Sequence, residues 1–322
     1  MRIVVTGSAG YLGSMLASDL LVQGHSVVGI DSLLHGGASL AGLAGHPQFT
    51  FHHADLRDPA AVAAALRGAE AVVHLAAIVG EPACNRDPEL TRAVNFEASL
   101  RLAEAARAAG VERFLFASTC SNYGKMPDAS GYVDEASPLQ PLSVYAETKV
   151  AVERHLLESP RSRGFVPTVL RLSTVYGLSF RPRFDLTVNE FAAEAVVNRK
   201  LVVFGEQFWR PYVHVRDVAR AVSAVLNAPV PAVQNAVFNV GGTAENYTKK
   251  MLVDLLLERL PGTNVEFVKR DNDPRDYRVR FGKIEDQLGF RPSLTVPRGL
   301  DEVIAAIRTG VIADFTSKEF RN

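Results

Sequence analysis

The sequence predicts an α/β protein whose first half folds as a doubly wound parallel sheet, and two observations carry that prediction. Short apolar runs rich in β-branched residues alternate with segments rich in Ala, Leu, Glu and Arg through the first half. Each apolar run is nearly free of polar residues, as expected for strands that helices cover on both faces. At 322 residues, the chain is long enough for one large domain or two lobes.

The predicted elements of the first half alternate strictly along the chain. Strands are expected at Ile3–Thr6, Ser26–Ile30, Phe49–His53, Ala71–Leu75, Phe114–Ala117 and Thr168–Leu172. Helices are expected between them at residues 12–23, 58–67, 89–109 and 143–159. Because this spacing is typical of β-α-β units, we predict a first domain over residues 1–172.

The second half is less regular. Helices are expected at Phe184–Asn198, 216–227, Lys249–Leu260, Ile284–Leu288 and Val296–Thr309. Strands are expected at Leu201–Phe204, Tyr212–Val215 and Val237–Val240. We predict that residues 173–322 form a second, smaller α/β lobe that binds substrate over the carboxyl edge of the sheet. Residues 211–240 either belong to this lobe or return to the first domain.

Charge and cysteine content narrow the class of protein. Lys plus Arg and Asp plus Glu both number 35, so no overall field favours nucleic acid or an anionic membrane. The two cysteines, Cys84 and Cys120, form no CxxC motif, which argues against a disulfide framework or a cysteine-based zinc site. No apolar run approaches the ~20 residues of a membrane span, and no signal-peptide pattern opens the chain. We therefore expect a cytoplasmic protein without a bound metal.

A glycine-rich turn follows the first strand, as Thr6-Gly7-x-x-Gly10-x-x-Gly13. Gly7 permits the tight turn, Gly10 lets backbone N–H groups approach a pyrophosphate, and Gly13 permits close packing of helix on strand. Glycine triplets also occur in simple turns, but here the strand before and the helix after match a Rossmann dinucleotide site. We expect cofactor contacts from Gly7, Gly10, Tyr11, Leu12 and Gly13.

An acidic residue ends the second strand, in Val-Val-Gly-Ile-Asp31. Its carboxylate is placed to accept a hydrogen bond from a ribose 2′-OH and to repel a 2′-phosphate. Residues 32–37 contain no Arg or Lys to hold that phosphate, so NAD is favoured over NADP. The alternative is that Asp31 only caps a loop or helix. Further positions expected beside the cofactor, at later strand ends, are Asp55, Leu56, Leu75, Ala76 and Ala77.

Tyr145 and Lys149 lie one helical turn apart and share a helix face. A free phenol has a pKa near ~10, and lowering it to ~7 requires about 4 kcal/mol. A neighbouring ammonium and a cationic nicotinamide are expected to supply this, so that Tyr145 takes a proton from an alcohol as hydride leaves its carbon. Thr119 precedes Tyr145 by 26 residues and ends a buried strand, where this fold places function. Taken alone, Thr119 is better explained as a turn or cap residue.

These motifs resemble the extended short-chain dehydrogenase/reductase family, in particular its nucleotide-sugar epimerases and dehydratases. The resemblance covers essentially the whole chain and rests on TGSAGYLG at 6–13, Asp31, HLAA at 74–77, Asn95, STCSNYG at 118–124, YAETK at 145–149, RPYVHVRD at 210–217, FNVGG at 238–242 and LGFRP at 288–292. It implies that NAD stays bound while a sugar carbon, commonly C4, is oxidised. It also implies that Thr119 bonds the reacting oxygen, that Tyr145 is the base, and that Lys149 holds the nicotinamide ribose. Asn95 is expected beside the cofactor.

The same resemblance implies a nucleoside-diphosphate sugar as substrate. Arg210 occupies the place where similar proteins use an arginine on the diphosphate or its ribose, and Arg275 and Arg278 are candidate partners. Solvated surface salt bridges are the alternative for each arginine. Further candidates for substrate contact are Cys120, Arg181, Arg183 and Asn189, and Cys84 and Asn85 either approach the sugar or belong to a plain loop.

The chain departs from the family pattern at several positions. Sugar dehydratases carry an acidic pair or a Glu just after the catalytic Thr or Ser, whereas this chain has Cys120 and Ser121. We therefore expect neither 4,6-dehydration nor decarboxylation. Thr174 replaces the usual Asn before Val-Tyr-Gly, and Asp273-Pro-Arg-Asp276 replaces Arg-Pro-Gly-Asp.

The first hypothesis is an NAD-dependent epimerase of a nucleoside-diphosphate sugar that works through a transient keto sugar, expected to be the 4-keto form. The runner-up is a dehydrogenase or reductase with net redox on such a sugar. A non-catalytic NAD-sensing protein is the third reading, and the Thr119, Tyr145 and Lys149 set argues against it. Helices 89–109 and 143–159 are rich in Ala and Leu around more than one face, and similar proteins pair these helices across a twofold axis. We therefore expect a homodimer.

Overall fold

A parallel sheet of seven strands lies at the centre of the computed structural model, which describes residues 1–126, 131–158, 164–269 and 275–322. Its strand order is β10-β6-β5-β4-β1-β2-β3, and every pairing is parallel. The strands are β1 (Arg2–Thr6), β2 (Ser26–Asp31), β3 (Phe49–His53), β4 (Ala71–His74), β5 (Arg113–Thr119), β6 (Val166–Leu172) and β10 (Ala236–Val240). This architecture confirms the predicted doubly wound sheet.

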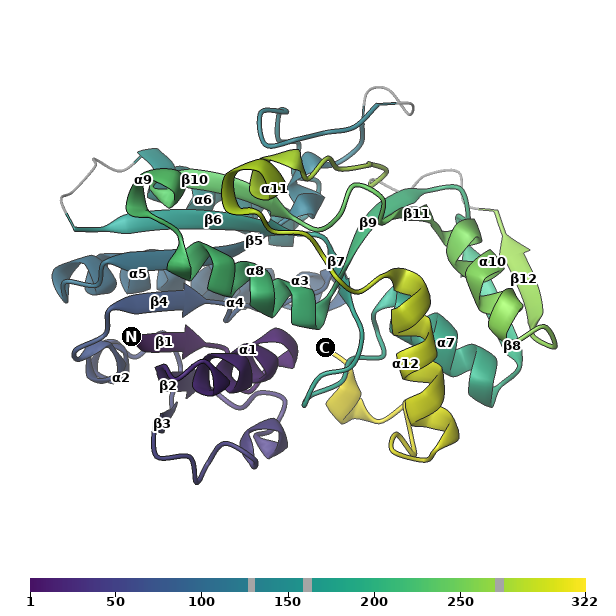
Figure 1. Ribbon diagram of the computed structural model, residues 1–322, viewed down its shortest axis with the longest axis horizontal. Helices are drawn as coiled ribbons and strands as arrows, with labels where there is room; N and C mark the ends of the chain where they lie inside the picture. The colour runs from purple at the N-terminus through teal and green to yellow at the C-terminus, as the bar shows by residue number, and fades with distance from the viewer. Residues whose placement is uncertain (127–130, 159–163, 270–274) are drawn as a thin grey trace.

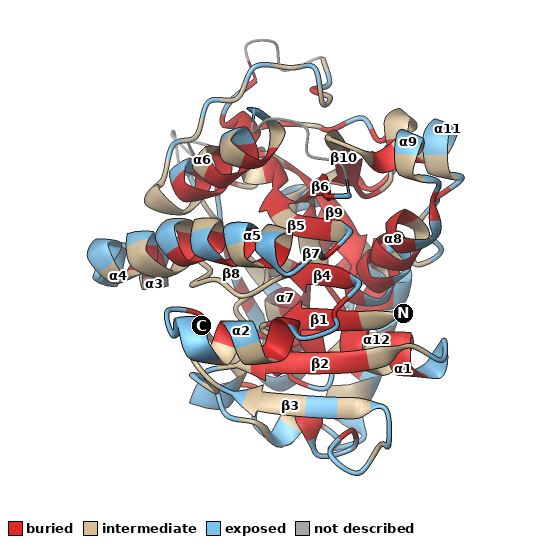
Figure 2. Cartoon of the chain, turned by 90° about the vertical axis from the view of Figure 1, so that its left-hand side faces the viewer, coloured by how far each residue is buried: buried red, intermediate tan, exposed pale blue. Residues whose placement is uncertain are grey.

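Helices cover both faces of this sheet, as Figure 2 shows. One layer contains α1 (Tyr11–Val22) and α8 (Val215–Asn227), and the other contains α2 (Pro59–Leu66), α5 (Ala98–Ala108) and α6 (Val144–Glu158). Successive residues of β1 point to opposite faces, so Ile3 and Val5 join one core cluster while Val4 joins the other. The central strands, such as β4, are buried along their whole length because helices cover both faces, whereas the edge strand β3 is partly exposed and carries polar residues.

The helix predicted over residues 89–109 is interrupted. It consists of α4 (Pro88–Arg92), a π-helical turn over Ala93–Glu97 and α5. The π-helical turn carries the fully buried Asn95. Such turns often occur at functional sites, and the continuous helical pattern of the sequence gives no sign of this one.

The second lobe has its own core, at the right of Figure 1. Its helices α7 (Thr187–Val197), α10 (Lys249–Arg259) and α12 (Val296–Arg308) pack around buried side chains such as Tyr176, Tyr212 and Leu300. A three-stranded sheet is formed by β7 (Thr174–Tyr176), β9 (Trp209–His214) and β11 (Asn246–Thr248), and β8 (Lys200–Phe204) pairs with β12 (Asn264–Val268). The remaining short helices are α3 (Glu81–Arg86), α9 (Val230–Val233), α11 (Gly282–Leu288), and 3-10 turns at Ala38–Leu40, Cys120–Tyr123 and Lys318–Phe320.

The chain passes between the lobes more than once. Within residues 211–240, β9 lies in the three-stranded sheet, α8 packs on α1, and β10 pairs with β6. The chain therefore enters the first lobe again after first leaving it. No helix among the described residues is both long and apolar enough to span a membrane.

A buried carboxylate on α8 binds the segment that leads into α12. Asp217 is fully buried and accepts hydrogen bonds from the backbone N–H groups of Ser293 (3.0 Å) and Leu294 (2.8 Å) and from the Ser293 hydroxyl (3.0 Å). Arg220, one turn along the helix, forms an ion pair with it. A charged acceptor of several donors in a dry site contributes strongly to the stability of this connection between the lobes.

Replacing Asp217 with Asn is expected to lower the free energy of unfolding by about 2 kcal/mol, because an amide group would face donors that need an acceptor. Urea unfolding followed by circular dichroism measures the change. Asp254→Asn is the matched control, since the Lys250–Asp254 pair is exposed, and it is expected to change stability by less than about 0.5 kcal/mol. Equal effects of the two substitutions would contradict the role given to Asp217.

Candidate active site

The glycine turn has the shape expected of a pyrophosphate cradle. Gly7 has a φ of +70°, and a Cβ atom there would lie 2.9 Å from the Ala76 nitrogen. A Cβ atom on Gly13 would overlap the Gly7 carbonyl oxygen. Gly10 precedes α1 and offers no side-chain cap, so the first N–H groups of the helix remain available to an anion.

A buried hydroxyl joins this turn to the end of β4. The Thr6 hydroxyl oxygen accepts hydrogen bonds from the backbone N–H groups of Leu75 and Ala76, both at 3.1 Å. It also lies 2.7 Å from Nδ1 of His74, whose Nε2 lies 2.8 Å from the Ser99 hydroxyl. Burial lowers the pKa of His74 to about 3, so the imidazole is neutral and serves as a relay of hydrogen bonds. Sequence reasoning assigned Thr6 and His74 no role.

Asn95 secures the segment that follows β4. Its side-chain oxygen accepts from the Ile78 N–H at 2.7 Å, and its amide donates to the Ile78 carbonyl at 2.9 Å. This pairing fixes the backbone beyond Ala76 and Ala77, beside the glycine turn. The predicted contact of Asn95 with the cofactor remains a prediction, and the structure shows how it positions the neighbouring loop.

Asp31 lies at the end of β2, and backbone N–H groups bind both of its carboxylate oxygens. Its carboxylate accepts from the N–H groups of Ala9 (2.9 Å) and Leu33 (2.8 Å), which leaves lone pairs for a ribose hydroxyl. The Arg181 guanidinium of the second lobe lies within electrostatic range of Asp31, a proximity that the sequence did not reveal. Asp55 pairs with Arg57 at 2.7 Å.

Thr119, Tyr145 and Lys149 belong to two neighbouring elements. Thr119 ends β5, and its hydroxyl oxygen accepts from the Ser121 N–H at 3.1 Å, so it is a cap as well as a candidate catalytic group. Lys149 on α6 donates to the Ala117 carbonyl of β5 at 2.8 Å. Its ammonium lies 4.7 Å from the centroid of the Phe116 ring and 5.8 Å from that of the Tyr145 ring. Lys149 therefore faces the carboxyl end of β5, with the Tyr145 ring close to its ammonium.

Burial dominates the proton affinities of this pair. It lowers the pKa of Lys149 to about 8, while Cys84 and Glu153 act in the opposite direction. Burial raises the pKa of the Tyr145 phenol, with Cys84 also raising it and Arg183 lowering it. The expectation that Lys149 and a cationic nicotinamide together lower the pKa of Tyr145 stays a prediction, because these shifts belong to the protein by itself. Desolvation of the phenolate is the larger effect.

Cys84 and Arg183, which the sequence analysis named only as further candidates, both act on the Tyr145 phenol. Cys84 on α3 is 1% exposed and its thiol contacts the Ile78 carbonyl, whereas Asn85 beside it is exposed. Arg183 is 9% exposed and binds Asp185 through two hydrogen bonds of 3.0 and 2.6 Å. Both are far from Tyr145 in sequence, so only the folded chain shows their proximity.

The three candidate arginines lie among aromatic rings and carboxylates. Arg210 and Arg275 both act on the pKa of Tyr277, and the Arg210 guanidinium lies 5.6 Å from its ring. Arg275 also pairs with Glu81 of α3 at 3.3 Å, across the two lobes. The Arg278 guanidinium lies 4.7 and 4.9 Å from the ring centroids of Tyr132 and Trp209. Asp273 and Pro274, named for their departure from the family pattern, lie outside the described residues.

Two other predicted substrate residues bond to the protein backbone. The Asn189 side chain accepts from the Gly177 N–H and donates to the carbonyls of Gly177 and Arg183, each at 2.9 Å. The Cys120 thiol is buried and donates to the Arg171 carbonyl at 3.3 Å. These contacts hold the walls of the site, and direct contact of either side chain with substrate stays a prediction.

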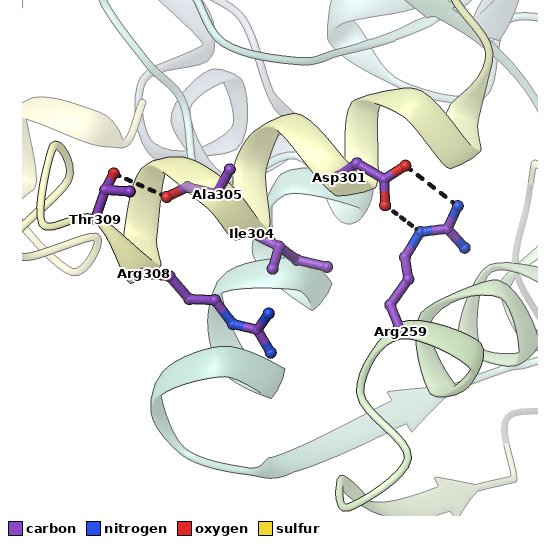
Figure 3. A pocket seen from close by; sticks show the side chains of 6 residues that line it. All are labelled: Arg259, Asp301, Ile304, Ala305, Arg308 and Thr309. Carbon is purple, nitrogen blue, oxygen red and sulfur yellow. Dashed lines mark hydrogen bonds and ion pairs between the residues drawn. The ribbon is translucent and has the colours of Figure 1, made fainter.

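A pocket on α12 lies apart from these residues. It is lined by Arg259, Asp301, Ile304, Ala305, Arg308 and Thr309, and contains none of the predicted site residues (Figure 3). Asp301 in it is already paired with Arg259 at 2.6 Å. Within the described parts of the chain, no group of three or more His, Cys, Asp or Glu side chains is arranged to hold a metal ion.

Comparisons with known proteins agree with this arrangement. The model of the NAD dependent epimerase/dehydratase family matches residues 3–241. A UDP-glucose 4-epimerase from Mycolicibacterium smegmatis is 32% identical, over 96% of this chain and 99% of its own length. A dTDP-glucose 4,6-dehydratase from Streptomyces venezuelae, solved with NAD and TYD bound, is 29% identical with a TM-score of 0.85, over 96% and 97% of the two chains. The UDP-glucose 4-epimerase of Thermus thermophilus in complex with NAD is 30% identical with a TM-score of 0.82, over 96% and 99%.

The glycine turn provides a direct test of cofactor binding. Gly13→Ala is expected to weaken NAD binding by about 10-fold or more, because the added Cβ overlaps a backbone oxygen and the turn must shift. Calorimetric titration with NAD measures the affinity. Gly262→Ala is the control, since no atom lies within 4 Å of its added Cβ, and its NAD affinity is expected to match that of the unmodified protein. Unchanged affinity in Gly13→Ala would show that the cofactor lies elsewhere.

Proposed function

The chain belongs to the NAD-dependent epimerase/dehydratase family, and on this premise we propose that it interconverts epimers of a nucleoside-diphosphate sugar through a transient 4-keto sugar. One observation carries the proposal. Lys149 of α6 donates to the Ala117 carbonyl, two residues before Thr119, and its ammonium lies 5.8 Å from the Tyr145 ring, at the end of a strand in the sheet that also carries the glycine turn. This is the edge at which open α/β sheets bind their ligands.

The residues present fit NAD. The missing Cβ atoms at Gly7 and Gly13 leave a backbone cradle at the N-terminus of α1, and the Asp31 carboxylate lies beside it. When bound, NAD supplies an acceptor for a hydride from a carbinol carbon and can return it. Lys149 is proposed to hold the nicotinamide ribose. The other proposed cofactor contacts are Gly10, Tyr11, Leu12, Asp55, Leu56, Leu75, Ala76, Ala77 and Asn95.

The three catalytic side chains divide the proton chemistry among them. Thr119 is proposed to donate a hydrogen bond from its hydroxyl to the reacting sugar oxygen. The Thr119 hydroxyl oxygen already accepts from the Ser121 N–H, which orients the hydroxyl as a donor. Tyr145 takes the alcohol proton and later returns it. Because burial raises its pKa, Tyr145 needs positive charge close by, and Lys149 and Arg183 provide it within the protein.

The diphosphate of the substrate is assigned to Arg210, Arg275 and Arg278. Arg210 is 8% exposed, so its charge acts in a partly dry environment where an anion binds more strongly than at an open surface. Arg275 would exchange its contact with Glu81 for the diphosphate. Bidentate geometry makes arginine suited to phosphate oxygens.

The neighbourhood of Thr119 supports epimerisation rather than dehydration. The two residues that follow it are Cys120, whose thiol is committed to the Arg171 carbonyl, and Ser121, whose hydroxyl lies 3.4 Å from that of Tyr277. Neither position carries the carboxylate that water elimination from a sugar requires. Net oxidation or reduction of the sugar is the second candidate, because the same three catalytic residues serve it.

Tyr145→Phe is expected to reduce turnover by ~1000-fold with NAD affinity unchanged, because the variant keeps the ring and loses the proton carrier. NMR of UDP- and dTDP-hexoses incubated with the protein follows the interconversion of epimers. Tyr247→Phe is the matched control, since that hydroxyl contacts only Glu245 among the described residues, at 3.5 Å.

The same experiment separates the candidates. Epimer interconversion without accumulation of NADH supports the epimerase, and a stable NADH absorbance after one turnover supports the dehydrogenase. If none of the nucleotide sugars reacts while Tyr145→Phe binds NAD as the unmodified protein does, the enzymatic proposal fails.

We further propose a cytoplasmic homodimer that pairs through residues 89–109 and 143–159, of which residue 159 lies outside the described residues. On α5 and α6 this surface carries the partly exposed Leu100, Ala105, Ala151 and Leu157, and Figure 2 shows both helices on the outside of their layer. The two free, buried thiols, Cys84 and Cys120, suit a reducing compartment.

Light scattering at micromolar concentration is expected to give twice the chain mass of 34.9 kDa. Ala151→Arg is expected to shift the mass toward that of one chain, because a buried unpaired charge opposes association. The exposed control Ala244→Arg, which lies outside both ranges, is expected to remain dimeric. A single-chain mass for the unmodified protein would refute the dimer.

A further inference from the structure

A single buried carboxylate joins the elements that carry the catalytic residues. Glu153 lies on α6, one turn beyond Lys149, and its side chain is 2% exposed. Arg171 of β6 donates to it through Nε at 3.1 Å and Nη2 at 2.7 Å. The Ser118 hydroxyl at the end of β5 and the Asn122 amide (2.8 Å) donate to its other oxygen.

These contacts reach all three catalytic residues without involving them directly. Ser118 immediately precedes Thr119, and Asn122 lies in the 3-10 turn that Thr119 caps. Glu153 shares the helix α6 with Tyr145 and Lys149. Any displacement of α6 along β5 that changed the spacing between Thr119 and the tyrosine would therefore also have to break bonds of Glu153.

The network also continues toward the proposed diphosphate site. Arg171 donates from Nη1 to the Tyr123 hydroxyl at 3.0 Å, and that hydroxyl donates to the Asn239 side chain of β10 at 2.7 Å. The Asn239 amide lies 3.4 Å from the Arg280 carbonyl. Arg280 belongs to the segment that carries Arg275 and Arg278. The contacts from Glu153 through Arg171, Tyr123 and Asn239 therefore connect α6 to this segment.

Glu153 also differs in charge from the other groups near Lys149. From α3, Cys84 faces it as a thiol whose pKa is raised by burial, and from β4, His74 faces it as a neutral imidazole. On α6 itself, the Tyr145 phenol is neutral at pH 7 because burial raises its pKa. β5 offers the Ala117 carbonyl and the Phe116 ring, and the Arg171 cation of β6 lies beyond Glu153. Cys84 and Glu153 both oppose the effect of burial on the pKa of Lys149, and Glu153 is the carboxylate of the two.

Stability alone does not explain an ion pair at this depth. Removing two charges from water carries a large desolvation penalty, and well-packed apolar residues of similar volume often serve as well or better. The hydrogen bonds of Glu153 instead join α6 to the ends of β5 and β6. Small displacements of catalytic side chains at these strand ends would lower the rate of the reaction.

We propose that Glu153, held by Arg171, is the positioning residue of this active site, fixing α6 against β5 and keeping an anion one turn from Lys149. The proposal rests on the proposed function only in taking Thr119, Tyr145 and Lys149 as the catalytic set.

Two variants test it. Glu153→Gln removes the charge and keeps the size of the side chain. The double variant Glu153→Met with Arg171→Met removes both charges and keeps an apolar volume, so it is expected to stay folded even if the single variant does not. Asp217→Asn is the matched control, because it removes a buried carboxylate of α8 that has no contact with α6 among the described residues.

The first measurement needs no substrate. In protein labelled with 13C at lysine Cε, the Lys149 resonance is assigned by its loss in Lys149→Arg and followed with pH. Glu153→Gln is expected to lower the pKa of Lys149 by about one unit, the double variant to lower it by less because the Arg171 cation is removed as well, and Asp217→Asn to leave it unchanged. An unaltered Lys149 titration in the folded variants overturns the electrostatic part of the proposal, whatever the enzyme's substrate proves to be.

The second measurement is turnover with the sugar found active above. The double variant is expected to lose ~100-fold in kcat with KM nearly unchanged, while Asp217→Asn loses thermal stability and keeps its kcat. The alkaline limb of the kcat profile is also expected to move to lower pH in the double variant, because Lys149 loses its proton earlier. A stable double variant with normal kcat overturns the positioning role. Absence of turnover in the unmodified protein would count against the proposed function and leave the lysine titration to decide this proposal.

Discussion

The close approach of backbone to backbone around Gly7 is the constraint on which the rest of the site depends. Because Gly7 and Gly13 lack Cβ atoms, α1 begins directly beside β1, and the segment after β4 passes within contact distance of the turn. Thr6 then reaches the N–H groups of Leu75 and Ala76. Tyr11, the first residue of the helix, donates to the Gly177 carbonyl at 2.7 Å and so ties the turn to the second lobe. A single side chain at Gly13 would displace all of these contacts together.

The features predicted correctly from the sequence are those that short segments determine. The alternation of strand and helix follows from local apolar patterns, and the turn at Gly7 between β1 and α1 follows from a few consecutive residues. The roles assigned to Asp31, Tyr145 and Lys149 stay predictions. The strand β12 was missed because most of its residues are exposed and its pairing with β8 bridges about sixty residues. Glu81 with Arg275, Arg183 beside Tyr145, and Glu153 with Arg171 were missed for the same reason, since each joins distant parts of the chain.

The raised pKa of Tyr145 in the protein by itself has a physical origin of the same kind. Sequence shows that a lysine lies one turn from Tyr145, and this favours the phenolate. It does not show how much water the folded chain removes from the ring, and burial is the larger influence. The direction of a pKa shift is set by the balance between nearby charges and desolvation. Desolvation depends on how the whole chain folds around the group.

The burial of Lys149 has a thermodynamic consequence for the protein as a whole. Its pKa is about 8 in the native state and near 10.5 when the chain is unfolded, so unfolding takes up a proton between those pH values and native stability rises with pH across that window. Below pH 8 both states are protonated and the buried charge disfavours folding by about 3 kcal/mol. A neutral side chain of similar shape would give a more stable protein. The lysine is therefore an instance of the trade-off between stability and activity, in which a destabilising group is retained at the site where it acts.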